Sequence, residues 1–261
     1  MREFKELFNA NENTQHEIAD FYHANSNLDV SNMQSFARRI DVYAKIKNLE
    51  GSLPEDKFPY SQKIKLLPQK FIFPINFSKL LFRRRSRRVF SEKLISLKDI
   101  SRLLQLSYGK VKTGENYLST VPSAGAIYPL HIYILSLNTE LEKGIYHYYF
   151  MNDWMDKIKT DSNLSQKTQE LIYGGNLEGT PSLYLCITAD FEELIAKYGE
   201  RGYRFALIES GHLAQNIMLV AESMNLNMVA LGGYYDKALA KLIDANYQNE
   251  KVLYVMAVGK L

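Results

Sequence analysis

Two hydrophobic periods alternate along most of the chain, and each predicts its own kind of element. Apolar residues recur at helical spacing after the capping-box pattern that starts at Ser96, and again over the long stretch 203–224. Short apolar runs bounded by turn residues predict strands at 130–137, 145–150, 154–158, 183–188 and 252–258. A short strand before Gly232 and a helix over 236–242 complete the pattern. Strands interspersed with helices indicate an α+β or α/β fold.

The first 79 residues differ from the rest in composition and pattern. They are rich in Asn, Lys and Ser, and they predict two amphipathic helices, over 14–23 and over 32–47, the second after a Ser31 cap. A stretch punctuated by four prolines follows, which favours an extended connector lying on the body. We therefore expect a helical arm at residues 1–79 and a folded body at residues 80–261.

Composition limits the classes of protein to which the chain can belong. With 46% hydrophobic and 23% charged residues among 261, it can bury a sizeable core and is not intrinsically disordered. The longest apolar run, 252–258, is far too short to span a membrane, and no secretory signal is visible. A single cysteine, Cys186, excludes an internal disulfide framework and fits a reducing compartment. We expect a cytoplasmic protein with no membrane partner.

The positive charge of the chain comes from one short segment. Five arginines lie within residues 83–88, and without them the count of Lys and Arg falls from 32 to 27, against 29 Asp and Glu. By itself this run leaves three interpretations open: a solvated charge run, a nucleic-acid contact, or a phosphate pocket for one cofactor. Apolar residues on both sides, such as Phe82 and Val89, tie the run to a core and disfavour a free tail.

Several common catalytic and binding signatures are absent from the sequence. There is no glycine-rich dinucleotide fingerprint and no P-loop, so neither kind of nucleotide site has its backbone cradle. Ser210 lacks the glycine two places earlier that a nucleophile elbow has. The five histidines have no metal-ligand spacing, and we expect no metal site.

An ordered set of motifs in the body carries a resemblance to a known family. The set runs from RRSRR at 84–88 through PSAGAIYP at 122–129 and GIYHY at 144–148 to GERGYRF at 199–205, ESGHLAQN at 209–216 and GGY at 232–234. This succession resembles the flavin-dependent nitroreductase superfamily. Within it, the chain is most similar to the SagB-type branch, which includes the thiazoline/oxazoline dehydrogenases of ribosomally made peptides. The resemblance covers Leu80 to the C-terminus, and FYHANS at 21–26 also resembles the branch's N-terminal histidine motif.

The family implies an α+β fold, with helices flanking a mixed central sheet, and an interlocked homodimer that binds FMN at its interface. Carried over by position, the residues that would hold the FMN phosphate and ribityl chain are Arg84, Arg85, Ser86 and Arg88, with a further phosphate contact from Lys260. Those beside the isoalloxazine ring would be Pro122, Ser123, Ala124 and Gly125, with Gly232 and Gly233 at the flavin edge. The chemistry agrees, because a doubly charged phosphate needs concentrated cations and a flat ring approached by backbone needs Gly and Ala.

The pair Lys197 and Tyr198 stands directly before Gly199. Adjacent helical residues point about 100° apart, but a helix end at Gly199 lets both side chains line one pocket. In the azoline dehydrogenases a Lys-Tyr pair at this motif serves proton abstraction. The resemblance therefore implies that Lys197 or Tyr198 removes the acidic Cα proton of an azoline while the Cβ hydride passes to flavin N5, with dioxygen as the oxidant that restores the flavin. Either Lys197 is the base once it has lost its own proton, or Tyr198 acts as a phenolate that Lys197 stabilises.

The resemblance thus favours an FMN-dependent oxidase of thiazoline and oxazoline rings in a modified precursor peptide, such as a bacteriocin, with a cyclodehydratase or another biosynthetic partner. Two alternatives stay open. One is a reductase of dehydroalanine residues in a lanthipeptide, in which NAD(P)H reduces the flavin. The other is a non-catalytic peptide-binding subunit. The Lys-Tyr pair favours oxidation, and a nucleic-acid partner is no longer expected. The arm either grips a leader peptide or partner, or wraps over the dimer.

Overall fold

The computed structural model describes residues 12–50, 56–68, 76–114 and 116–261. Two prolines of the predicted connector, Pro54 and Pro74, lie outside these ranges. The described chain divides into two compact units. The first holds the N-terminal helices together with Leu194–Arg204, and the second holds the rest of the described chain. The first unit therefore combines segments that are far apart in the sequence.

The first unit is built on the two helices that the sequence predicts. These are α2 (Glu12–Asn25) and α3 (Met33–Glu50). The expected cap at Ser31 is wrong, because the carboxylate of Asp29 takes that place and accepts the N–H groups of Ser31 at 2.7 Å and Asn32 at 3.2 Å. A carboxylate satisfies the free N–H groups at a helix start as well as a serine hydroxyl does.

A seven-stranded sheet forms the centre of the second unit. Its order is β1-β6-β5-β4-β8-β11-β9. The strands span Gln62–Lys65, Trp154–Thr160, Gly144–Tyr148, Leu130–Ser136, Leu183–Asp190, Glu250–Gly259 and Asn227–Leu231, in that order. The five strands predicted over 130–258 are all present, as is the short strand before Gly232. The edge strand β1 was not predicted, because QKIK is mostly polar and lies in the proline-punctuated connector.

The sheet is antiparallel at every pairing between its seven strands, whereas a mixed sheet was expected. Strands β4, β5 and β6 follow one another as a meander, which forces opposite directions on neighbours. Among the described residues, parallel pairing occurs only at two single bridges outside the strands, Val89–Glu178 and Ile95–Thr139. The α+β character of the fold is as predicted.

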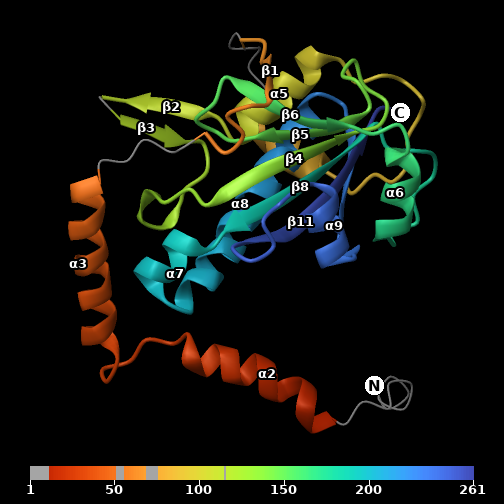
Figure 1. Cartoon of the computed structure of the whole chain (residues 1–261). Helices are drawn as coiled ribbons and strands as arrows, with labels where there is room; N and C mark the ends of the chain where they lie inside the picture. Colours follow the sequence, from red (N-terminus) through yellow and green to blue (C-terminus); the bar gives the residue numbers. More distant parts are fainter. Residues whose placement is uncertain (1–11, 51–55, 69–75, 115) are drawn as a thin grey trace. The chain divides into compact units, whose positions relative to one another are not determined.

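Helices cover both faces of this sheet. On one face, α6 (Leu164–Leu171) and α9 (Asp236–Leu242) contribute to a buried cluster with sheet residues such as Tyr133, Leu135 and Cys186. The buried residues of α5 (Leu97–Ser107) and of α8 (Arg201–Ser223) do not belong to that cluster. In Figure 1 both helices lie behind the sheet. The predicted capping box of α5 is confirmed, since the Ser96 side chain accepts the N–H of Asp99 at 3.1 Å.

The remaining elements are short. They are α4 (Phe77–Arg83), the hairpin β2 (Lys110–Thr113) and β3 (Asn116–Ser119), the pair β7 (Ile172–Tyr173) and β10 (Gly233–Tyr234), the 3₁₀ turn η1 (Ala124–Ala126), and α7 (Glu192–Tyr198). Among the described residues, no helix combines the length and apolar character that crossing a bilayer takes.

Candidate functional site

The arginine run lies between α4 and the rest of the second unit, and its members have different environments. Arg87 forms a salt bridge with the buried carboxylate of Glu222 near the end of α8, and the Nε of Arg83 lies 3.4 Å from the same carboxylate. The N–H of Arg87 also donates to the carbonyl of Met228 at 2.9 Å, at the start of β9. These two arginines therefore fix the segment to the body.

The other three arginines of the run, Arg84, Arg85 and Arg88, have a different environment. In the described part of the chain, no carboxylate lies within ion-pair distance of Arg84, Arg85 or Arg88. Arg85 donates only to the backbone carbonyls of Phe82 and Arg84, each at 2.8 Å, and Arg88 and Ser86 are exposed. Three uncompensated guanidinium groups and a hydroxyl on one fixed loop suit a dianionic phosphate.

Lys260, the fourth cation expected at this site, has a partner. Its Nζ lies 3.1 Å from the Asp99 carboxylate, while its carbonyl accepts the N–H of Ser91 at 2.8 Å. Lys260 thus lies beside the end of the arginine segment, but its charge is already balanced by a carboxylate.

The PSAGA string forms a tight loop around η1. Gly125, Ala126 and Tyr128 have φ values of 60°, 55° and 53°, a left-handed conformation that favours glycine. The Ser123 hydroxyl accepts the N–H of Tyr128 at 2.8 Å across the loop. Left-handed conformations at alanine and tyrosine persist only where the surrounding structure holds them, so the shape of this loop is fixed.

Glu209 on α8 faces this loop and was given no role by the sequence. Its side chain is buried, and neither carboxylate oxygen completes a hydrogen bond within the described structure, although the Ser123 hydroxyl and the Ala124 N–H approach it. Burial raises the pKa of Glu209 to about 7, against the opposing effect of those two groups. A carboxyl that gains or loses a proton near neutral pH therefore borders the predicted flavin loop.

This pKa predicts the pH dependence of a Glu209→Gln variant. The folded protein keeps the Glu209 proton up to about pH 7, whereas the unfolded chain loses it near its ordinary value of 4.5. Wild-type stability therefore falls as pH rises between these values, by up to about 3 kcal/mol. Glutamine cannot ionise, so the free energy of unfolding of the variant does not fall in this way. In urea unfolding it should match wild type at pH 5 to within about 1 kcal/mol and be more stable at pH 8.

Glu92→Gln, at an exposed carboxyl, is the matched control and should show the same difference from wild type at both pH values. Equal stability of wild type and Glu209→Gln at pH 8 would contradict the raised pKa.

The two glycines after β9 have different surroundings. A Cβ on Gly233 would come within 2.5 Å of the Tyr173 carbonyl, its antiparallel partner in β7, so the pairing itself requires glycine there. A Cβ on Gly232 would meet nothing within 4 Å. Packing accounts for Gly233 and gives no reason for Gly232.

The arginine segment and the PSAGA loop approach α8 at different residues. The segment is fixed at Glu222, whereas the loop faces Glu209, thirteen residues earlier on α8. Thirteen helical residues span about 20 Å. The two carboxyl groups that these segments approach therefore lie at different positions along the same helix.

The predicted catalytic pair belongs to the first unit. Helix α7 ends at Tyr198, and Gly199 follows with φ of 58° while its N–H donates to the Ile195 carbonyl at 2.8 Å. Lys197 and Tyr198 are both half-buried, and the Lys197 Nζ lies 5.2 Å from the Tyr198 ring centroid. The expected helix end at Gly199 is confirmed.

The N-terminal FYHANS motif packs against GERGYRF within the first unit. Arg204 donates from Nε to the Ser26 hydroxyl at 2.7 Å and from Nη2 to the His23 carbonyl at 2.7 Å. Arg201 donates to the Ser26 carbonyl at 2.9 Å, and the Tyr22 ring lies under the Arg204 guanidinium at 5.7 Å. Two motifs some 180 residues apart in the sequence thus form one clamp.

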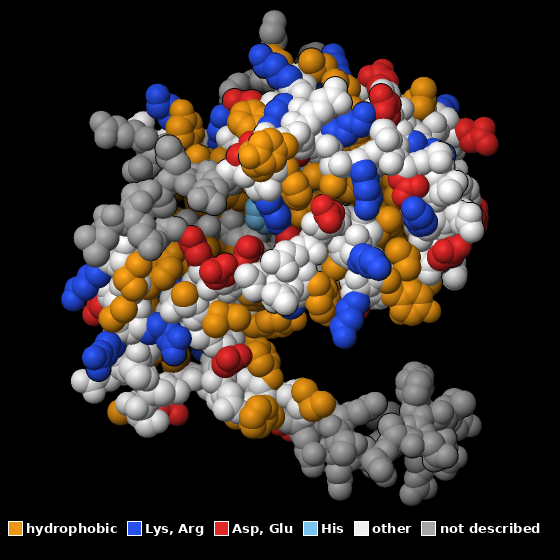
Figure 2. Space-filling model, viewed as in Figure 1, with side chains coloured by type: hydrophobic (Ala, Val, Ile, Leu, Met, Phe, Trp, Pro, Cys, Tyr) orange, Lys and Arg blue, Asp and Glu red, His pale blue; other side chains and the backbone are white. Residues whose placement is uncertain are grey.

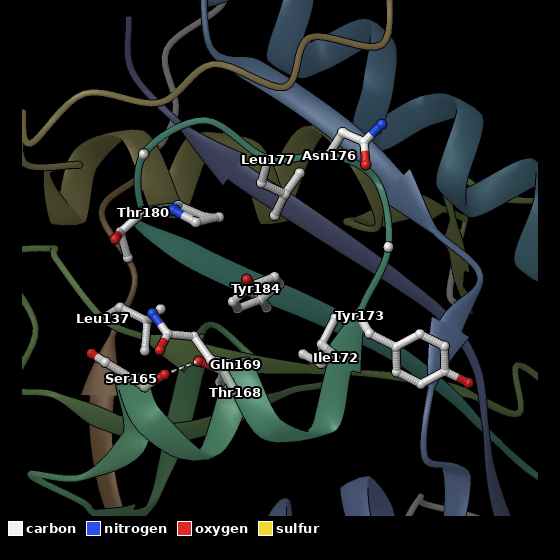
Figure 3. Close-up of a pocket in the computed structure, with 13 residues that line it drawn as sticks. Leu137, Ser165, Thr168, Gln169, Ile172, Tyr173, Asn176, Leu177, Thr180 and Tyr184 are labelled. Atoms are coloured by element: carbon white, nitrogen blue, oxygen red, sulfur yellow. Dashed lines mark hydrogen bonds between the residues drawn. The ribbon is translucent and has the colours of Figure 1, made fainter.

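The cavity shown in Figure 3 is not part of this predicted site. It has a volume of about 350 Å³ and lies between α6, β7 and the loop that leads to β8. Leu177 from the loop and Tyr184 from β8 point into it, and no Lys, Arg, Asp or Glu lines it. Without a cation it does not suit a phosphate group.

Charge on the visible surface is dispersed. On the face drawn in Figure 2, Lys and Arg side chains are interspersed with Asp and Glu and form no continuous basic band. A band of that kind is the electrostatic feature of a nucleic-acid-binding surface.

Residues 81–260 match the Nitroreductase family, and this interval covers well over half of the chain. The chain belongs to the nitroreductase family. This nitroreductase-family protein is 32% identical over 187 residues to the nitroreductase-like protein MJ1384 of Methanocaldococcus jannaschii. The aligned part covers 71% of this chain and 91% of MJ1384. It is 29% identical over 172 residues to the microcin B17-processing protein McbC of Escherichia coli, covering 63% of this chain and 62% of McbC.

Solved structures agree with the family. A nitroreductase-like protein of Anabaena variabilis superposes with a TM-score of 0.71 at 25% identity, covering 92% of this chain and 46% of that one. A chain of the E. coli microcin synthetase McbBCD, solved with truncated pro-MccB17 bound, gives 0.61 at 24% identity and covers 90% and 98%. A fold neighbour from Exiguobacterium sibiricum, solved with FMN, gives 0.53 at 13% identity and covers 73% and 90%. The nitroreductase fold is therefore shown, and members of this fold bind FMN.

Proposed function

We propose that this nitroreductase-family protein is an FMN-dependent oxidoreductase that oxidises thiazoline or oxazoline rings in a ribosomally made peptide. The observation that carries the proposal is the meeting of Lys197 and Tyr198 at the end of α7. Incubation of the flavin-loaded protein with a synthetic peptide that carries one thiazoline tests it. A product lighter by two hydrogens supports the proposal, and an unchanged mass contradicts it.

The FMN phosphate fits the arginines that no carboxylate of the described chain neutralises. Arg84, Arg85 and Arg88 would bind the phosphate with Ser86, while Arg87 stays with Glu222. Lys260 contributes less, because Asp99 already balances its charge. The fixed PSAGA loop (Pro122, Ser123, Ala124 and Gly125) offers backbone to the flat ring, and the open space at Gly232 admits its edge.

FMN held by the arginine segment and the PSAGA loop would supply the acceptor for the hydride that leaves the azoline Cβ. Tyr198 takes the Cα proton, so that one proton and one hydride leave the ring, and dioxygen is the final oxidant. Burial raises the pKa of Tyr198, which by itself opposes the phenolate form. The Lys197 ammonium, 5.2 Å from the centroid of that ring, is the nearby positive charge that would favour a phenolate at Tyr198. We therefore assign the proton transfer to Tyr198 and the supporting charge to Lys197.

The peptide substrate rests on two relatives. McbC, 29% identical, is named for processing microcin B17, and the McbBCD complex holds truncated pro-MccB17. By analogy, this chain acts on a modified precursor peptide and works with biosynthetic partners such as a cyclodehydratase. NAD(P)H has no part in the oxidative direction.

The two halves of the FMN site come together in a homodimer. The carboxyl groups that these two segments approach on α8, Glu222 and Glu209, are thirteen residues or about 20 Å apart. A second chain would bring the arginine segment of one protomer to the PSAGA loop of the other. Helix α8 carries the apolar surface that a dimer would bury, since Leu207 is 44% and Ile208 55% exposed in the single chain. This exposure also explains why the apolar pattern of α8 continues round the helix.

Ile208→Asp is expected to dissociate this dimer. A charge without a partner in an apolar interface should raise the dissociation constant of the dimer by about 100-fold or more, as the loss of a central contact does. Size-exclusion chromatography with light scattering should find a monomer that has also lost FMN. Leu94→Asp, at a leucine that is 53% exposed and not part of α8, should leave the dimer intact. A dimeric Ile208→Asp protein would exclude this face as the interface.

A further inference from the structure

Helix α3 presents one face to the Lys-Tyr pair. Its half-buried residues include Phe36, Ile40 and Tyr43, which recur at i, i+4 and i+7 and so share one side of the helix. The Phe36 ring stacks on Tyr198, with centroids 6.1 Å apart and planes 28° from parallel. The Lys197 Nζ lies 5.1 Å from the Tyr43 ring centroid. Each member of the pair therefore contacts its own aromatic residue of the arm.

Lys197 in consequence lies against two aromatic rings at once. Its ammonium is 5.1 Å from the Tyr43 centroid and 5.2 Å from the Tyr198 centroid, both within the range of cation–π attraction. Such contacts restrict the position of the ammonium, which the long and flexible lysine side chain does not fix by itself. The same contacts hold the ammonium beside the Tyr198 ring.

We propose that the N-terminal arm positions the catalytic pair, with Tyr43 holding Lys197 and Phe36 holding Tyr198 in the arrangement that proton transfer needs. This inference rests on the proposed function, in which the pair handles the substrate proton. Phe36 and Tyr43 contact Tyr198 and Lys197 and are positioning residues. The arm thereby has a catalytic task beyond covering a dimer or gripping a leader peptide.

The clamp at the other side of Gly199 supports the same assignment. Arg201 and Arg204 hold the end of α2 through Ser26 and His23, three to seven residues after the pair. The arm is therefore fixed to this segment at two places, before and after the turn at Gly199. A single accidental contact would not produce two independent attachments around one motif.

Lysine NMR on the flavin-loaded protein tests the packing directly. Reductive ¹³C-methylation keeps the charge of lysine, and comparison with Lys197→Arg assigns the Lys197 signal. In wild type, ring currents of two aromatic rings should move this signal upfield of the other lysines. Tyr43→Leu keeps the bulk and removes the ring, so the signal should return toward the others. Tyr43→Phe keeps the ring and should leave it in place.

Kinetics on the thiazoline peptide test the consequence. Tyr43→Leu should lower kcat by about tenfold, with KM and FMN content within about twofold of wild type, and Tyr43→Phe should restore the rate. Val42→Ala, next to Tyr43 but 47% exposed, is the matched control and should change neither signal nor rate. An unmoved Lys197 signal in Tyr43→Leu, or a moved signal with full kcat, would overturn the inference. Absence of oxidation by wild type would overturn the proposed function instead, while the NMR comparison still decides whether Tyr43 holds Lys197.

Discussion

Tyr198→Phe is expected to lower the turnover of a thiazoline peptide by about 10²- to 10⁴-fold while FMN stays bound. The substitution removes only the hydroxyl that takes the Cα proton and keeps the ring that stacks on Phe36 and faces Lys197. Packing in the first unit should therefore persist. Steady-state oxidation gives the rate, and flavin absorbance of the same samples gives the FMN content.

Two comparisons make this prediction specific. Tyr60→Phe, at a fully exposed tyrosine, should leave the rate unchanged. Lys197→Arg keeps a positive charge that also stacks on aromatic rings but cannot act as a base. It should retain far more activity than Lys197→Ala, because the role assigned to Lys197 is its charge. Full activity of Tyr198→Phe would refute the assignment, and equal inactivity of both Lys197 variants would point to Lys197 as the base.

Arg84→Ala and Arg88→Ala are each expected to weaken FMN binding by about 10- to 100-fold, because each removes a charge-assisted contact to a phosphate. Neither arginine has a carboxylate partner among the described residues, so the stability of the folded protein should not change. Fluorescence titration with FMN measures the effect. Riboflavin, which has no phosphate, should bind these variants and wild type equally well.

Arg87→Ala is the contrasting variant within the same run. It leaves the buried Glu222 without its main partner, so it should lower the melting temperature. Because Arg87 is about a third exposed, the loss should be smaller than for a fully buried pair. Its FMN affinity, measured below the melting transition, should stay near wild type. If Arg87→Ala loses FMN as strongly as Arg88→Ala, the division of the run into anchoring and binding arginines is wrong.

Much of the fold could be predicted because its central strands carry their own signal. Strands β4, β8 and β11 are buried on both faces and appear in the sequence as continuous apolar runs. Short elements such as β1 and α4 have mixed composition, and they form because the body offers them a partner or a cap. The direction of strand pairing could not be predicted either, because an apolar run does not indicate whether a strand pairs in parallel or antiparallel.

The sequence indicated which segments belong to the candidate site. It did not indicate how the individual residues of those segments differ in role. The run at 83–88 contains five arginines that the sequence does not distinguish. Arg87 differs from Arg88 because it forms a salt bridge with Glu222, some 135 residues later. Glu209 stands in a helical pattern like any surface glutamate, and its raised pKa depends on burial against the PSAGA loop. The contacts of Phe36 and Tyr43 with the Lys-Tyr pair join segments far apart in the chain, which no local period reveals.

Mass spectrometry of the peptide product tests the central claim most directly. The purified, FMN-loaded protein is incubated in air with one peptide that carries a thiazoline and, separately, with one that carries a dehydroalanine and NADPH. The account predicts that the thiazoline peptide loses two hydrogens, that Tyr198→Phe abolishes the loss, and that the dehydroalanine peptide keeps its mass. A thiazoline peptide of unchanged mass, or a dehydroalanine peptide that gains two hydrogens, would contradict it.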